Sequence, residues 1–171
     1  MSLNSEEAVI QETVEQIKEI FSFTKESKQV PLTEIQRVII PNIQQLSEKQ
    51  DVFTILSQLQ SKDDYTYRHN IGVCVLSTLI GTWINLNAAD LSALSTAALL
   101  HDIGKVGIPN DILNKPGKLT DTEFQIMKRH TNYGYEILKN TKYCEEVYST
   151  VAIEHHESYS KKRIFTGTRY V

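Results

Sequence analysis

The chain has 171 residues, of which 40% are hydrophobic and 23% charged, with a formal net charge of −3. This length allows one domain with a real core and a small appendage. The weak negative charge gives no general attraction to nucleic acid or acidic lipid. No apolar run approaches the length of a membrane span, and the N-terminus lacks a basic-then-apolar leader. We therefore expect a cytoplasmic protein that binds neither duplex nucleic acid nor membrane.

Residues 1–60 predict a helical N-terminal extension, and they contain no histidine, cysteine or glycine. A helix is expected from about Ser5 to Lys25, and Pro31 suits the first turn of a second helix, which Pro41 should kink or interrupt. A third, short helix follows. The extension is either a dimerisation or signalling element, or a set of helices that packs against the main core. A dimerisation element would make the protein a homodimer. The expected apolar stripes are Ile10, Val14, Ile17 and Phe21, then Ile35, Ile39, Ile43 and Leu46, then Phe53, Leu56 and Leu59.

Residues 61–157 predict a second unit made of four longer helices, at about 63–85, 88–103, 120–139 and from 144 onward. Gly104 and Gly107 should end the second of these, and a loop with a turn at Lys115 follows. Thr120 and Glu123 form the capping-box pattern that opens the third. Strand signals are scarce, so the predicted fold class is an all-α helical bundle. The apolar stripes are His69, Val73, Leu76, Ile80 and Trp83; Leu91, Leu94, Ala98 and His101; Met127, His130, Gly134 and Ile137; and Val147, Val151 and His155.

The two cysteines, Cys74 and Cys144, lie far apart and outside any paired-ligand spacing. We expect two reduced, partly buried thiols.

The histidines form the most informative pattern in the chain. Four of the five fall in the apolar stripes of four different predicted helices. A single buried imidazole is usually an ordinary core residue, but several together with a carboxylate would need many separate polar partners, and one metal centre satisfies them all. His155 and His156 are helix neighbours that point about 100° apart, so both reach one site only if it is wide, as two adjacent metals would be. The candidate ligands are His69, His101, Asp102, His130, His155 and His156.

Two further residues lie close to these ligands along the chain. Lys105 comes three residues after Asp102, where an ammonium could hold a phosphate oxygen and counter charge in a transition state. The alternative is a solvated surface lysine. Gly134 comes four residues after His130, and its missing side chain leaves room either for a substrate or for close helix packing.

The run His101-Asp102-Ile103-Gly104-Lys105 resembles the motif of the HD metal-dependent phosphohydrolase superfamily. Flanking segments resemble the HD-GYP subfamily in order and spacing over residues 61–157. These segments are DYTYRHN at 64–70, VGIPNDIL at 106–113, KPGKLT at 115–120, MKRH at 127–130 and HHE at 155–157.

The resemblance implies a bacterial phosphodiesterase that hydrolyses cyclic di-GMP to linear pGpG and often on to GMP. It implies a helical bundle with two or three divalent metals, often iron or manganese, with zinc, cobalt, nickel or magnesium as further candidates. By position, the six residues given above are the metal ligands, and Lys105 contacts phosphate. The implied mechanism is metal-assisted in-line hydrolysis. Two alternatives remain: a weak or inactive signalling module, and a phosphohydrolase for another nucleotide.

The chain departs from the subfamily pattern after Glu157. Residues 158–171 form a divergent basic tail without the Gly-Tyr-Pro segment and without the acidic residue that the subfamily supplies from a later helix. Tyr65 stands where three-metal members carry a glutamate. We therefore expect at most two metals, one of them short of a protein ligand, and an apolar surface exposed unless another chain covers it. A truncated or frame-shifted gene is one hypothesis, which the coding DNA would test; natural divergence is the other.

Overall fold

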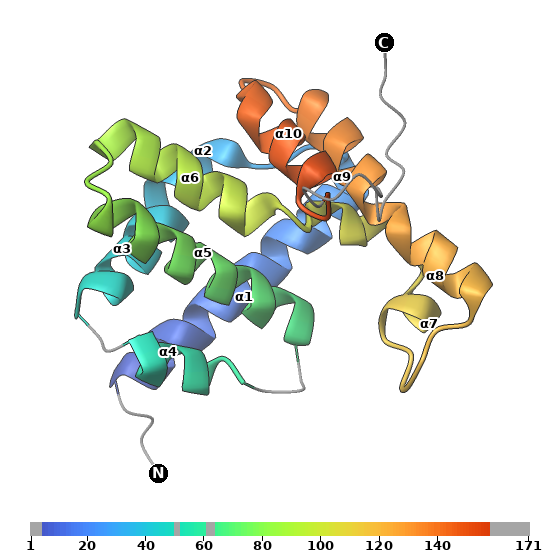
Figure 1. The fold of residues 1–171 in the computed structure, drawn as a ribbon, viewed down its shortest axis with the longest axis horizontal. Helices are drawn as coiled ribbons and strands as arrows, with labels where there is room; N and C mark the ends of the chain where they lie inside the picture. Colours follow the sequence, from blue (N-terminus) through green and yellow to red (C-terminus); the bar gives the residue numbers. More distant parts are fainter. Residues whose placement is uncertain (1–4, 50–51, 61–63, 158–171) are drawn as a thin grey trace.

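The computed structural model describes residues 5–49, 52–60 and 64–157 (Figure 1). The basic tail expected at 158–171 lies outside the described residues. Within the described part every regular element is helical, which confirms the all-α prediction. The elements are α1 (Ser5–Ser27), α2 (Leu32–Glu34), a π-helical turn η1 (Ile35–Ile39), α3 (Ile40–Lys49), α4 (Val52–Gln58), α5 (Tyr65–Trp83), α6 (Ala88–Leu100), a 3₁₀ turn η2 (Ile103–Gly107), α7 (Asn110–Leu113), α8 (Asp121–Lys128), α9 (His130–Lys139) and α10 (Glu146–Glu154).

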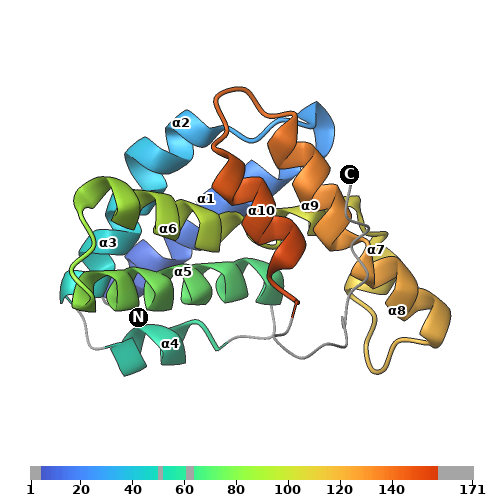
Figure 2. The ribbon, with the colours of Figure 1, turned by 45° about the horizontal axis from the view of Figure 1, so that its top comes forward.

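The helices pack around one hydrophobic core. α5 lies along α6, α10 packs against both α6 and α9, and α9 packs against η2 (Figures 1 and 2). α1 crosses behind α5 and touches η2. Buried side chains from the N-terminal helices, such as Ile17 and Ile35, belong to the same cluster as Ile71, Leu99 and Leu138. The N-terminal helices thus share the core of the bundle, while a role in dimerisation stays a prediction.

α1, η1 and α3 bury their predicted stripes, with one difference in helix type near Pro41. The chain stays helical through this residue, because the wider π turn η1 precedes it and α3 continues beyond it. A proline cannot donate the backbone hydrogen bond that an α-helix needs, and a π turn is a common way to absorb such a defect. The predicted interruption is therefore a local change of helix type. On α4 the prediction for Phe53 is wrong, because its side chain is 77% exposed and Ile55 fills the core instead.

On α5 the structure buries a different face from the predicted one. Leu76, Ile80 and Trp83 are 41%, 52% and 71% exposed. The neighbouring face, which includes Ile71 and Val75, packs into the core. The predicted stripe was wrong here because α5 is apolar on more than one face, so periodicity could not choose between them.

The C-terminal half of the chain has shorter helices than predicted. α6 ends at Leu100, and the chain continues through His101 and Asp102 into η2. The predicted helix at 120–139 is two helices, since the chain turns at Arg129 between α8 and α9. The short helix α7 lies in the segment predicted as a loop. The capping box at Thr120 and Glu123 is confirmed, with both reciprocal hydrogen bonds present.

Both cysteines are free thiols, as predicted. Cys74 is fully buried on α5 and donates to the backbone carbonyl of Ser95 on α6, with an Sγ–O distance of 3.2 Å. Burial raises the pKa of the Cys74 thiol to about 12. None of the helices in the described part of the chain is long and apolar enough to cross a membrane.

Candidate metal centre

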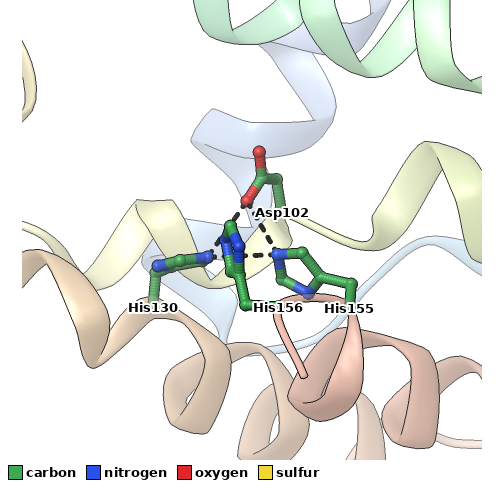
Figure 3. Close-up of side chains that lie close together, drawn as sticks. All are labelled: Asp102, His130, His155 and His156. Atoms are coloured by element: carbon green, nitrogen blue, oxygen red, sulfur yellow. Dashed lines mark hydrogen bonds and ion pairs between the residues drawn. The ribbon is translucent and has the colours of Figure 1, made fainter. Parts of the chain in front are cut away.

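The structure brings all six predicted ligands to one place, where four separate segments meet. One histidine lies near the start of α5, and a His-Asp pair lies at the junction of α6 and η2. A further histidine opens α9, and the last two follow α10 directly. Figure 3 shows four of these side chains converging from the last three segments. The residues are His69; His101 and Asp102; His130; and His155 and His156.

The carboxylate of Asp102 lies at the centre of this cluster and is 3% exposed. Its Oδ2 atom is 3.3 Å from Nε2 of His101 and 3.9 Å from Nε2 of His69. Its Oδ1 atom is 3.2 Å from Nε2 of His130 and 3.6 Å from Nε2 of His155. Each oxygen therefore faces a different set of imidazoles, so Asp102 could act as a ligand together with either set.

The donor atoms form two groups that share Asp102, and within each group all atoms lie within 4.8 Å of one another. The first group is His69, His101 and Asp102, and the second is Asp102, His130, His155 and His156.

Three of the histidines are oriented by backbone carbonyls three residues earlier. Nδ1 of His101 is 2.7 Å from the carbonyl oxygen of Ala98, and Nδ1 of His130 is 2.8 Å from that of Met127. Nδ1 of His155 is 3.0 Å from the carbonyl oxygen of Ala152. Since a carbonyl only accepts, each Nδ1 carries the proton, and the lone pair of each neutral ring is on Nε2. That nitrogen is the one that points at Asp102. Backbone acceptors of this kind commonly fix the tautomer of metal-binding histidines.

The cluster has polar features that a cation would satisfy. Oδ1 of Asp102 is buried and accepts no hydrogen bond in the described structure. Nε2 of His130 and Nε2 of His155 lie 3.3 Å apart, and in the neutral rings both atoms carry lone pairs. Converging lone pairs and a buried carboxylate oxygen repel each other unless a positive charge lies between them. The donor set of imidazoles with one carboxylate fits a divalent transition metal.

The histidines at the edge of the cluster are held in the form that binds metals. Burial lowers the pKa of His69, and the neighbouring Asp102 only partly offsets this effect. Burial, together with His155 and His130, lowers the pKa of His156 to about 4. At neutral pH both rings are therefore uncharged, as a ligand must be.

Lys105 is the immediate partner of the central carboxylate. Its Nζ lies 2.6 Å from Oδ2 of Asp102, and its side chain is 17% exposed. Burial of Asp102 opposes its ionisation, but the Lys105 ammonium holds the pKa of this carboxyl below its usual range. The carboxylate is therefore charged at any physiological pH, and Lys105 is not an ordinary solvated lysine.

Two glycines allow the segments of the site to approach closely. A Cβ at Gly104 would overlap the carbonyl oxygen of His130 and the amide nitrogen of Gly134. A Cβ at Gly134 would lie 3.3 Å from that of Ala152 on α10. Of the two interpretations of Gly134, close helix packing is therefore the correct one. Gly104 serves the same contact, because its φ angle is not in the left-handed region.

Several contacts around the cluster were not predicted from the sequence. The ring of Tyr65 stacks on that of His69, with centroids 5.9 Å apart and planes 13° from parallel. Arg68 ties α5 to its neighbours through hydrogen bonds to Gln58 and Gln11, so its role is structural. The three carbonyls that orient the histidines carry no side-chain signal, although their spacing of three residues follows from helix geometry.

Comparison with known proteins places the chain in a family. The model of the family described as "HD domain" matches residues 66–169, more than half of the sequence. The chain belongs to the HD domain family. The match contains the whole of the cluster described above and starts within α5, so α1 to α4 lie outside it.

Several relatives with curated names are similar to the same region. A protein from Pseudomonas aeruginosa named cyclic di-GMP phosphodiesterase is 39% identical over 102 residues, which is 60% of this chain and 25% of the relative. A Thermotoga maritima protein of the same name is 40% identical over 109 residues, covering 63% and 30%. A Vibrio cholerae protein named 3′3′-cGAMP-specific phosphodiesterase 2 is 32% identical over 114 residues, covering 66% and 22%.

These relatives confirm the resemblance to the HD-GYP subfamily. The chain spans about a quarter of the length of the relatives it matches.

Proposed function

We propose that this protein is a metal-dependent phosphodiesterase that hydrolyses a cyclic dinucleotide, with cyclic di-GMP, cut to linear pGpG and GMP, as the first candidate. The observation that carries the proposal is the pair of donor groups that share the two oxygens of Asp102, with Lys105 bound to one of them. The names of the similar proteins from Pseudomonas aeruginosa and Thermotoga maritima point to the same substrate.

Two divalent ions would be held, one by each donor group, with Asp102 between them. Neutral imidazoles with a single carboxylate favour iron or manganese over calcium and magnesium, and zinc, cobalt and nickel accept the same donors. When bound, such ions lower the pKa of water and neutralise the charge of a phosphate. The proposed ligands are His69, His101 and Asp102 in the first group, and Asp102, His130, His155 and His156 in the second.

The residues of the chain supply position and charge. Asp102 is ionised and nearly sealed from solvent, and the carbonyls behind the imidazoles fix the direction of each Nε2. The ammonium of Lys105 donates one N–H to Asp102, and its remaining N–H groups can donate to a phosphate oxygen. This ammonium would then stabilise the charge that develops on the phosphate during in-line attack by water.

The test is metal content and turnover of the full chain. Protein loaded with Mn²⁺ or Fe²⁺ should release pGpG from cyclic di-GMP. Asp102→Asn keeps the shape of the side chain but loses its charge, so bound metal should fall at least tenfold and turnover by about a hundredfold or more. Asp111→Asn is the matched control, because Asp111 is exposed on α7.

The outcomes separate the candidate functions. Equal metal content and turnover in the Asp102→Asn variant would contradict the proposed centre. Tight binding of cyclic di-GMP without product would indicate a signalling module, and turnover of other nucleotides alone would indicate a different phosphohydrolase. The Vibrio cholerae relatives named for 3′3′-cGAMP make that dinucleotide the second substrate to assay.

A further inference from the structure

A polar cleft of about 650 Å³ opens beside the candidate metal centre. Its described lining comes from α1, the start of α5, η2 and α7. Four lysines and one aspartate lie on this lining, although the chain as a whole has a net charge of −3. A concave surface lined by ammonium groups can attract and hold an anion where such a group is not already paired with a carboxylate.

The cleft and the metal centre share residues. Lys105 lines the cleft and contacts Asp102 through its ammonium. Tyr65 also lines the cleft, is 66% exposed, and stacks on His69. A substrate larger than one phosphate that sits at the metals would therefore extend into this cleft.

One face of α1 forms a wall of the cleft. Lys18, Phe21, Ser22 and Lys25 recur at the three- and four-residue spacing of a single helix face, and all four line the cleft. Phe21 holds the wall in place, because its ring is 5% exposed and meets the ring of Tyr67 edge-on at 5.2 Å. α1 lies outside the region matched by the HD domain model.

The lysines of the lining differ in what they already bind. The ammonium of Lys18 is 2.6 Å from Asp64, and that of Lys115 is 2.6 Å from Glu123. Lys105 is bound to Asp102. The side chain of Lys25 is exposed and makes no hydrogen bond or ion pair with any residue that the structure describes. Its charge is therefore available to a ligand.

We propose that Lys25, with the hydroxyl of Ser22 one turn away, binds a second phosphodiester of the substrate at the α1 wall. This inference rests on the proposed function, because a cyclic dinucleotide carries two phosphodiester anions in one ring. While one is cleaved at the metals, the other needs a partner for its charge. The N-terminal helix is then part of the substrate site and selects for molecules with two phosphates.

The test compares Lys25→Gln with Lys118→Gln in the metal-loaded full chain. Lys118 is also exposed but does not line the cleft. Loss of one charged contact should raise KM for cyclic di-GMP about fivefold in Lys25→Gln and leave it unchanged in Lys118→Gln. Lys25→Arg should restore most of the affinity, since it restores the charge.

A second substrate distinguishes the loss of a phosphate subsite from a general effect of Lys25→Gln on the active site. Bis(4-nitrophenyl) phosphate carries a single phosphodiester, so its KM should change much less than that of cyclic di-GMP. An equal rise for both substrates, or no rise for cyclic di-GMP in an active protein, would overturn the subsite. Absence of cyclic dinucleotide hydrolysis by the unmodified protein would instead overturn the proposed function and, with it, this inference.

Discussion

At the scale of single residues, the site depends on backbone carbonyls that orient the histidine rings. Each of His101, His130 and His155 gives its Nδ1 proton to the carbonyl three residues earlier. These carbonyls lie near helix C-terminal ends, where backbone acceptors lack partners within the helix. Each of these hydrogen bonds also fixes the ring that faces Asp102.

Gly104 offers the sharpest prediction about a single residue. Gly104→Ala would place a Cβ against backbone atoms of His130 and Gly134, which cannot move aside as a side-chain end can. We expect the free energy of unfolding to fall by about 3 kcal/mol, at the upper end of the range for overpacked sites. Chemical denaturation measures this change.

The control for Gly104→Ala is the same substitution on α5. A Cβ at Gly72 would meet Leu56 and Leu59 at 3.7 Å and 3.8 Å, which are ordinary contacts. Because alanine favours the interior of a helix, Gly72→Ala should stabilise the protein by about 0.5–1 kcal/mol. A Gly104→Ala variant as stable as the unmodified chain would show that α9 does not pack on η2 as described.

At the scale of elements, α7 and α8 differ from the rest of the bundle. They project from its edge, as Figure 1 shows, and α8 has no fully buried residue among its described side chains. The stability of α8 therefore depends on local interactions. These are the capping box of Thr120 and Glu123 and the contact of Glu123 with Lys115, in which the nearby ammonium and the Thr120 amide lower the pKa of Glu123 to about 2.

Thr120→Ala should consequently loosen α8 alone. Loss of an N-cap side chain costs about 1 kcal/mol, so amide hydrogen exchange in α8 should become about fivefold faster while α5 and α6 keep their protection. Thr122→Ala, at an exposed position of the same helix, serves as the control. Unchanged exchange in α8 after Thr120→Ala would contradict this account.

At the scale of the whole molecule, the metal centre joins parts of the chain that are far apart in sequence. The candidate ligands extend from His69 to His156, and they come from four segments that also share the hydrophobic core. An ion that binds these segments only when they are folded together stabilises the native state.

Metal should therefore raise the melting temperature of the chain. At a concentration of Mn²⁺ a hundred times its Kd, the stabilisation is about 2.7 kcal/mol, or roughly 5–10 °C for a chain of this size. Thermal unfolding followed by circular dichroism, with Mn²⁺ and with a chelator, measures the difference. Asp102→Asn should lose most of this shift, and an equal shift in that variant would place the bound ion elsewhere.

The residue pattern alone was enough to predict the all-α fold, the capping box at Thr120 and the five histidines that gather around Asp102. These features follow from local rules: helix periodicity, capping chemistry and the cost of burying several imidazoles without partners. The HD motif at His101 and Asp102 added the family to which the chain belongs.

Tertiary packing decided the features for which local rules allowed more than one answer. It chose the buried face of α5, because Ile71 and Leu76 are equally apolar and only contact with α6 and α3 separates them. It gave Gly104 and Gly134 their role, since backbone atoms from distant segments meet there. It also placed Lys25 in the cleft that Lys105 lines, because the docking of α1 on η2 depends on the shape of the whole core and not on the residues next to Lys25 in the chain.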